Sequence, residues 1–138
     1  MADIDFGQLS EALNDKADTD LRNVDTTAKA DAVIDYQEPT SANNYTWYRK
    51  YKSGWVEQGG RCSGAGYQTI NLLTPMADGN YTALTSILAP GSSISNPSAV
   101  TALINQRNTT TLVVLKSYGN GGQAGEDCLW QVSGIAAN

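Results

Sequence analysis

The spacing of hydrophobic residues changes along this chain, and the change lies near residue 40. In the lead, Phe6, Leu9 and Leu13 are three and four positions apart, which is typical of one face of a helix. The register of this stripe shifts after Leu13, as at a coiled-coil stutter. A single helix with so thin a stripe is not stable alone, but identical copies wound around one another would bury it. The lead therefore predicts a narrow multi-chain stalk, helical or extended.

The chain after Gln37-Glu38-Pro39-Thr40-Ser41 alternates with a period of two, so we place a stalk segment at 1–40 and a second domain at 41–138. Lys52-Ser53-Gly54 predicts a hairpin turn, and Gly59-Gly60 predicts a bulge or a close approach of two backbones. The pattern favours a mainly β domain, an antiparallel β-sandwich of about seven strands. The expected strands are 45–51, 55–58, 68–73, 81–88, 99–106, 109–118 and 127–135.

Charge divides the chain at the same place. Residues 1–40 hold ten of the fourteen acidic residues and carry a net charge of −7, whereas residues 41–138 carry +2. Neither part contains a run of Lys and Arg, so we expect no nucleic-acid partner. The acidic start lacks the apolar centre of a signal peptide, and no window of about 18 apolar residues exists, so we expect no membrane insertion.

Cys62 and Cys128 are the two cysteines of the chain, and they form no metal-ligand spacing. They are 66 positions apart, so they meet only if their strands are neighbours. Two interpretations stay open. The pair forms a disulfide, or both residues are small buried hydrophobic side chains, which a reducing compartment favours.

The chain contains no histidine, which removes the commonest general base, the Ser-His and Cys-His pairs and most zinc sites. A glycosidase needs two carboxylates about 5–10 Å apart. The second domain offers only Glu57, Asp78, Glu126 and Asp127 for that purpose. We expect a protein that is not an enzyme and that uses neither a cofactor nor a metal ion. A surface-glycan hydrolase is the less favoured alternative.

Polar and aromatic residues of the later loops are the candidates for binding. Aromatic rings stack on the apolar faces of sugars, while amides and carboxylates fix the directions of hydroxyl groups. The alternative for the tyrosines is that they only terminate strands, with their hydroxyls in water. The candidate binding residues are Tyr67, Tyr118, Asn120, Gln123 and Asp127.

Several motifs resemble the C-terminal domain found at the tips of bacteriophage tail fibres. WYRKYKSGWVEQGG at 47–60 is the most specific, because that family has an aromatic-rich strand, a short turn and a Gly-Trp-(Ile/Val)-Glu-Gln-Gly-Gly strand. TINLLTPMADGNYTALTSI at 69–87 resembles the family's two strands around a Pro-Met turn, and CLWQVSGIA at 128–136 resembles its last strand. LNDKADTDLRNV at 13–24 is similar to a linker of phage fibre proteins.

The resemblance implies a phage tail-fibre tip: a homotrimer whose stalk leads to a β-sandwich that attaches the virion to a bacterial surface polysaccharide or outer-surface protein. It also implies a place in the virion, after assembly in the bacterial cytoplasm. Trp47 and Trp55 would then support the hairpin and the core, near the subunit axis or in the sandwich interior. The loops 92–99 and 119–127 match no family pattern, so host specificity does not carry over. The alternative is a non-catalytic trimerisation or folding cap, with recognition by another protein.

Overall fold

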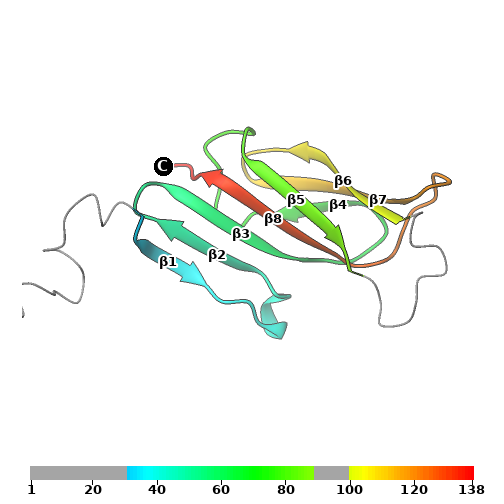
Figure 1. Cartoon of the computed structure of the whole chain (residues 1–138), viewed down its shortest axis with the longest axis horizontal. Helices are drawn as coiled ribbons and strands as arrows, with labels where there is room; N and C mark the ends of the chain where they lie inside the picture. Colours follow the sequence, from blue (N-terminus) through cyan, green and yellow to red (C-terminus); the bar gives the residue numbers. More distant parts are fainter. Residues whose placement is uncertain (1–30, 89–99) are drawn as a thin grey trace, which may run out of the picture.

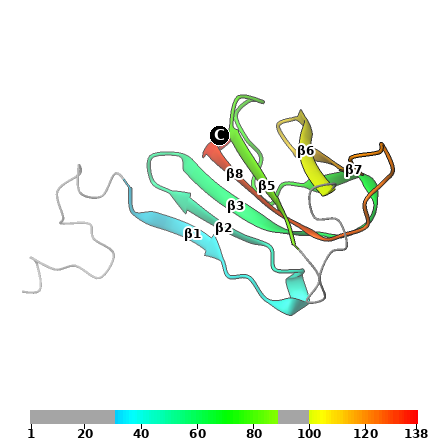
Figure 2. The same ribbon diagram turned by 45° about the vertical axis from the view of Figure 1, so that its right-hand side comes forward.

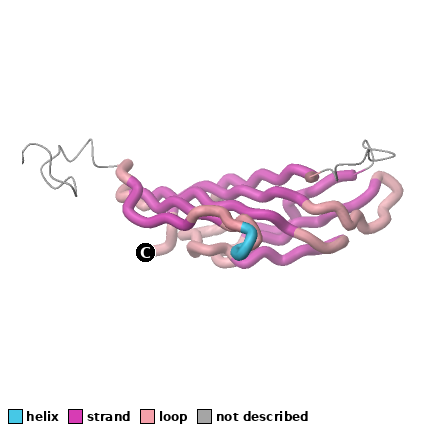
Figure 3. Tube along the Cα trace, turned by 90° about the horizontal axis from the view of Figure 1, so that it is seen from below, coloured by secondary structure: helices cyan, strands magenta, loops and turns pink. Residues whose placement is uncertain are grey.

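The computed structural model describes residues 31–88 and 100–138, and strands make up nearly all of their regular structure (Figure 1). The expected helical stripe and stalk lie outside the described residues, apart from 31–40. The one helical turn within the described ranges is the 3-10 helix Ser41–Asn43, coloured cyan in Figure 3. No helix in the described part of the chain is long and apolar enough to cross a membrane. The fold class is mainly β, as predicted.

Two antiparallel sheets form the expected sandwich. The larger sheet has the strand order β1-β2-β3-β8-β5, and the smaller has the order β4-β7-β6. The smaller sheet lies over the β8–β5 side of the larger one, so β1 and β2 extend beyond it as a wing (Figure 2). The strands are β1 Val33–Gln37, β2 Trp47–Tyr51, β3 Trp55–Cys62, β4 Gly66–Asn71, β5 Thr82–Ile87, β6 Val100–Arg107, β7 Thr111–Tyr118 and β8 Cys128–Ile135.

Each of the seven expected strands overlaps an observed one, and the eighth strand is β1. β1 pairs with β2 at the edge of the larger sheet. Residues 33–37 thus join the sheet, although they lie in the segment 1–40 that the sequence assigned to the stalk. Four of the five β1 side chains are exposed, so no hydrophobic alternation marked it as a strand. The assignment of the rest of that segment stays a prediction.

The hydrophobic core lies between the sheets and follows from alternation along the central strands. In β8, Trp130 and Val132 are buried while the intervening positions are more exposed. β7 contributes the buried Leu112 and Val114 from the opposite sheet. Full burial of an apolar side chain of this size contributes about 1.5–3 kcal/mol. These inward positions therefore hold the two sheets together.

The expectation that Trp47 and Trp55 support the sandwich interior is wrong. Trp55 is 39% exposed and Trp47 is only half-buried, and the tryptophan of the core is Trp130. The register explains this, because Trp47 lies opposite Gly59 and Trp55 lies opposite the exposed Ile135 on the outer face of the larger sheet. A position of either ring near a subunit axis stays a prediction.

The pair Gly59-Gly60 marks a close approach, one of the two outcomes that the sequence allowed. A Cβ on Gly59 would lie 2.7 Å from the carbonyl oxygen of Trp130 and 2.9 Å from the indole nitrogen of Trp47. The register of β3 with β8 continues through both glycines, so no bulge forms there. The Trp47 ring therefore packs directly against the backbone of β3 at Gly59.

The two ends of the sandwich carry different connections. One end carries the turns 52–54, 75–80 and 108–110, and we call it the turn end. Two backbone hydrogen bonds lie at this end: the Met76 amide donates to the Thr109 carbonyl (2.7 Å), and the Ala136 amide donates to the Gly54 carbonyl (2.8 Å). The described chain also enters there, because Lys52 donates to the carbonyl of Ala32. We call the loop end the opposite one, with the connections 63–65 and 119–127 (Figure 1).

A buried glutamine fixes the segment before the turn at 75–80. The Gln58 side chain is fully buried, and its amide nitrogen donates to the Thr74 carbonyl at 2.7 Å. Its amide oxygen accepts from the Thr74 amide at 3.0 Å. Because buried polar groups are costly when unpaired, this two-way bond sets the path of the chain between the sheets.

Candidate functional site

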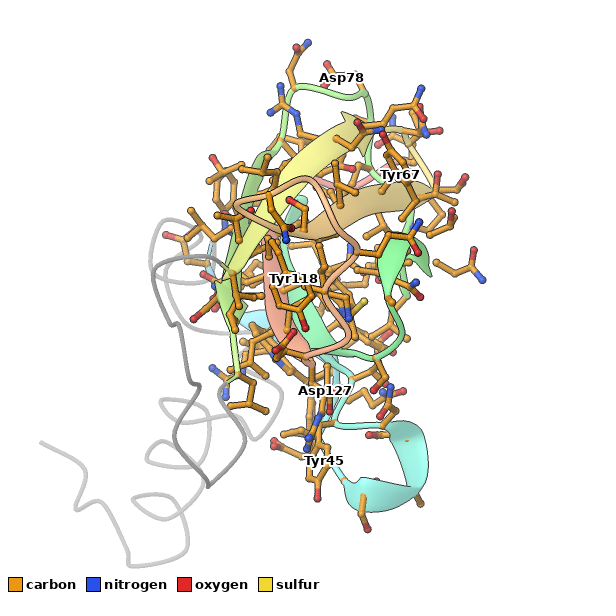
Figure 4. All side chains as sticks on the ribbon, turned by 90° about the vertical axis from the view of Figure 1, so that its right-hand side faces the viewer. Tyr45, Tyr67, Asp78, Tyr118 and Asp127 are labelled. Carbon is orange, nitrogen blue, oxygen red and sulfur yellow. The ribbon has the colours of Figure 1, made fainter. Side chains whose placement is uncertain are left out.

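The five candidate residues come from separate parts of the sequence, and the structure brings all of them to the loop end. Figure 4 views the domain toward this end, with Tyr118 above Asp127 and Tyr67 at the side. β4 supplies Tyr67, the end of β7 supplies Tyr118, and the segment before β8 supplies Asn120, Gln123 and Asp127.

Tyr67 is the most open aromatic ring of this set. It lies on β4, an edge strand of the smaller sheet, and is 62% exposed. Its backbone partner is Leu115 of β7, in the regular register of the sheet. The strand therefore holds the backbone while the ring faces solvent, which is the arrangement that stacking on a ligand requires.

Gln123 lies against Gly66, the residue that precedes Tyr67. Residue 123 forms an isolated bridge with Ser117, and its side chain covers Gly66. A Cβ on Gly66 would lie 2.6 Å from the side-chain carbon Cδ of Gln123, and Gly66 has a φ of +73°. The backbone conformation therefore favours glycine at 66, whereas the end of the flexible Gln123 side chain could move aside for a Cβ. The Gln123 amide thus lies at the residue before the exposed Tyr67.

Asn120 shapes the loop as well as facing outward. Its side-chain oxygen accepts a hydrogen bond from the Gly122 amide at 3.0 Å, which is an Asx-type turn. Gly121 between them has a φ of +86°, and its amide donates to the Tyr118 carbonyl at 2.9 Å. Asn120 is exposed, so this turn presents its amide to solvent.

The Tyr118 side chain, unlike that of Tyr67, is fixed by a hydrogen bond within the described part of the chain. Its hydroxyl donates to a carboxylate oxygen of Glu126 at 3.3 Å. The fully buried Lys116 donates from Nζ to the backbone carbonyl of Glu126 at 2.8 Å. The other carboxylate oxygen of Glu126 is buried without a hydrogen-bond partner among the described residues. These contacts tie the end of the loop to β7.

Asp127 anchors the base of the loop. Its carboxylate accepts from the guanidinium of Arg61, with an Nε–Oδ2 distance of 2.7 Å. Hydrogen bonds from Ser63 and Arg61 hold the pKa of Asp127 below its usual range. Since its charge is already paired within the protein, Asp127 fits a positioning role better than direct contact with a ligand.

A groove on the outer face of the larger sheet was missed by the sequence analysis. It has a volume of about 640 Å³ and lies between Tyr45 and Trp47 on one side and Leu84 and Leu129 on the other. Tyr45 has a φ of 57°, which is rare for a bulky residue, and is labelled near Asp127 in Figure 4. The sequence did show Trp47, but only strand register places its ring on the outside. A neighbouring cavity of about 230 Å³ shares Pro39 and Trp47 and adds Gln37, Glu38 and Arg49.

The carboxylates that the sequence singled out have local roles in the fold. Glu57 accepts a hydrogen bond from the Tyr51 hydroxyl at 3.0 Å. Asp78 accepts from the Asn80 amide at 2.7 Å in the turn that precedes β5. Within the described ranges, no group of three or more Cys, Asp and Glu residues is arranged to hold a metal ion.

Two solved structures that share this fold are pyocin tail fibres. No protein-family model matches the chain, and no curated protein does. An N-truncated R2-type pyocin tail fibre has a TM-score of 0.56 at 17% identity, over 97% of this chain and 52% of that one. An N-truncated R1-type pyocin tail fibre has a TM-score of 0.51 at 10% identity, over 98% of this chain and 100% of that one. This chain thus spans about half the length of the first fibre and shares the fold of both.

Proposed function

We propose that this protein is a non-catalytic receptor-binding tip of a phage tail fibre, which attaches the virion to a bacterial surface. The observation that carries the proposal is the position of the candidate residues. The chain enters the domain at the turn end, where Ala32 bonds to Lys52, and the candidates lie at the opposite end. An N-terminal stalk would therefore point the loop end toward the cell. The tail-fibre fold and the family motifs at 47–60 support this function.

We infer that the receptor is a surface glycan. The exposed ring of Tyr67 follows Gly66, which the exposed Gln123 side chain covers, and Asn120 adds a second exposed amide. Stacking from one group and hydrogen bonds from the others suit the two kinds of sugar surface. An outer-surface protein is the other possible receptor, and binding to purified surface polysaccharide distinguishes the two. Several copies per particle would make weak single sites sufficient.

The matched variants Tyr67→Ala and Tyr36→Ala test this function. Both rings are 62% exposed on edge strands, but Tyr36 lies in β1 of the other sheet. We expect fluorescently labelled Tyr67→Ala to bind about tenfold more weakly to a bacterial strain that binds the wild-type protein. The loss of stacking on one aromatic ring should cost about 1.4 kcal/mol of binding free energy, which corresponds to a tenfold change in affinity. Tyr36 lies opposite Arg49 on the outer face that is proposed below for trimer contacts, so Tyr36→Ala is compared at the same oligomeric mass and should then bind as the wild type does. Equal binding by all three proteins would refute the assignment of the site.

We further propose that the tip is a homotrimer, in which copies meet on the outer face of the larger sheet. This face exposes Trp55 (39%), Leu84 (61%), Leu129 (45%) and Ile135 (53%). Apolar patches of this kind mark interaction surfaces. Light scattering on a sizing column should give three times 14.7 kDa for the wild type. Leu84→Lys should reduce the mass to one copy, whereas Leu103→Lys, at a 54% exposed site on β6, should not.

The two alternatives predict different results. A trimerisation cap would form the trimer but bind no cells, and Tyr67→Ala would then change nothing. A surface-glycan hydrolase would release reducing ends from purified polysaccharide. The fold shared with tail fibres and the structural use of Glu57 and Asp78 favour the binding tip over the hydrolase.

A further inference from the structure

The two cysteines, whose relation the sequence left open, lie opposite one another in the structure. Cys62 is the last residue of β3, Cys128 is the first residue of β8, and the two are direct partners in the antiparallel register. Such partners have Cα atoms about 4.5–5.5 Å apart. That range lies within the separation of about 4.4–6.8 Å that a disulfide spans. Both residues are free cysteines here, at 6% and 0% exposure.

The surroundings prepare one thiol to react first. The hydrogen bond between the thiols, aided by the charge of Lys116, lowers the pKa of Cys62 to about 7. The same hydrogen bond and burial raise the pKa of Cys128. Cys62 is also the less buried of the two thiols, at 6% against 0% exposure, and it ends β3, so an oxidant reaches it first and Cys128 is the thiol that completes the reaction. The pair lies at strand ends, beside the connection 63–65, where local opening costs least.

We propose that Cys62 and Cys128 are an oxidation site at which a small disulfide, such as oxidised glutathione, closes a cross-strand bond. The Cys62 thiolate attacks one sulfur of the oxidant, and one glutathione leaves as its thiol with the proton lost from Cys62. Cys128 then loses its proton and attacks the sulfur of Cys62, and the second glutathione leaves with that proton. Two protein thiols are oxidised, and one oxidised glutathione is reduced to two thiols.

The bond would fix the base of the candidate receptor loop. Arg61 and Asp127, which form the ion pair at the loop end, immediately precede the two cysteines. The loop 119–127 leads directly into Cys128. A Cys62–Cys128 disulfide would therefore hold the end of this loop against β3 covalently, in addition to the Arg61–Asp127 ion pair. A disulfide that closes a chain segment of this length constrains the unfolded state strongly. The inference does not depend on the receptor, because it concerns only the pair and its strands.

The test is oxidation of the full chain by oxidised glutathione, followed by alkylation and peptide mapping without reduction. We expect the mass to fall by two hydrogen atoms, the peptides with Cys62 and Cys128 to be joined, and the melting temperature to rise on the order of 10 °C. Reductant should reverse all three changes. Thiols that both remain open to alkylation, a bond between two copies, or a lasting glutathione adduct would each overturn the proposal.

Serine variants separate the roles of the two thiols. Cys128→Ser should stop at the glutathione adduct on Cys62, with no gain in melting temperature. Cys62→Ser should react more slowly, because Cys128 is fully buried. Equal reaction rates in the two variants would contradict the order of attack. If either variant fails to fold, the peptide map of the wild type still decides whether the bond forms.

Discussion

The turn end and the loop end of the sandwich are built by different means. At the turn end, the Tyr81 hydroxyl donates to the carbonyls of Asn108 (3.1 Å) and Thr111 (3.3 Å), and the guanidinium of Arg107 lies 5.9 Å from the centre of the Tyr81 ring. At the loop end, exposed side chains and turns of glycine predominate, with one ion pair at the base. Recognition loops are commonly the least stable part of a rigid scaffold. The side-chain contacts described for the turn end thus lie away from the candidate binding residues.

The largest loss of stability should follow from removal of the buried side-chain amide of Gln58, which fixes the chain before the turn at 75–80. Gln58→Ala removes both partners of Thr74 and opens a cavity, so we expect the free energy of unfolding to fall by about 3 kcal/mol. Gln123→Ala, at an exposed site of the loop end, should change it by less than about 0.5 kcal/mol. Urea unfolding measures both. Equal losses would remove the contrast between the ends.

A pair of glycines gives the next largest difference. A Cβ on Gly134 would lie 2.8 Å from Cβ of Tyr81 and 3.0 Å from Cε of Met76, whereas a Cβ on Gly125 meets nothing within 4 Å. We therefore expect Gly134→Ala to destabilise the domain by about 2 kcal/mol and Gly125→Ala to be nearly neutral. The midpoint of thermal unfolding should separate them. An unchanged melting temperature for Gly134→Ala would mean that Tyr81 and Met76 can move aside at little cost in free energy.

Acid should weaken the loop end through Asp127. Its pKa is depressed in the folded state, so the stabilisation is present above the unfolded value of about 3.9 and is lost as the pH falls through the folded value. The exposed part of the pair limits this contribution to less than about 1 kcal/mol. Asp127→Asn should be less stable than the wild type at pH 7 and equal to it at the acid end. A constant difference at every pH would show that the charge is not the cause.

A substitution of Tyr67 should have the smallest effect on the free energy of unfolding, although we expect it to have the largest effect on binding to cells. Tyr67→Thr keeps a β-branched residue on the edge strand and removes an exposed ring, so the free energy of unfolding should change by less than about 0.5 kcal/mol. Unfolding and cell binding measured on the same preparation would separate the two properties. A large loss of stability would place Tyr67 in the scaffold.

Local patterns predicted most of the strands, and distant pairings explain what they missed. Alternation and turn residues located seven strands, because each signal lies within about ten residues. The pairing of β3 with β8 joins residues 66 positions apart at Cys62 and Cys128, and no local signal reports it. The same pairing decides which face Trp55 occupies. The groove at Trp47 depends on the register with β3 and was therefore hidden from the sequence.

The candidate residues were found by type rather than by geometry. Loop positions rich in Tyr, Asn and Gln meet at one end of the fold, since the strand ends that carry them cluster there, and their role in binding stays a prediction. Their separate roles required the structure: Asp127 pairs with Arg61, Asn120 closes a turn, and Tyr67 faces solvent. Gly66 beneath Gln123 had no sequence signal beyond a glycine-rich stretch.

The way in which the loop 119–127 is fastened has an evolutionary consequence. Lys116 holds the main-chain carbonyl of Glu126, the Tyr118 amide donates to the carbonyl of Gly122 (2.8 Å), and the Ala124 amide donates to that of Lys116 (3.2 Å). These attachments use backbone atoms of the loop, which any amino acid other than proline at the donor positions supplies. Exposed positions whose side chains make no such hydrogen bond, as at Gln123 and Gly125, are thus free to change while the frame persists, whereas Asn120 and Asp127 also hold the loop through their side chains. Such a loop can explore new ligands one substitution at a time without unfolding the domain that presents it.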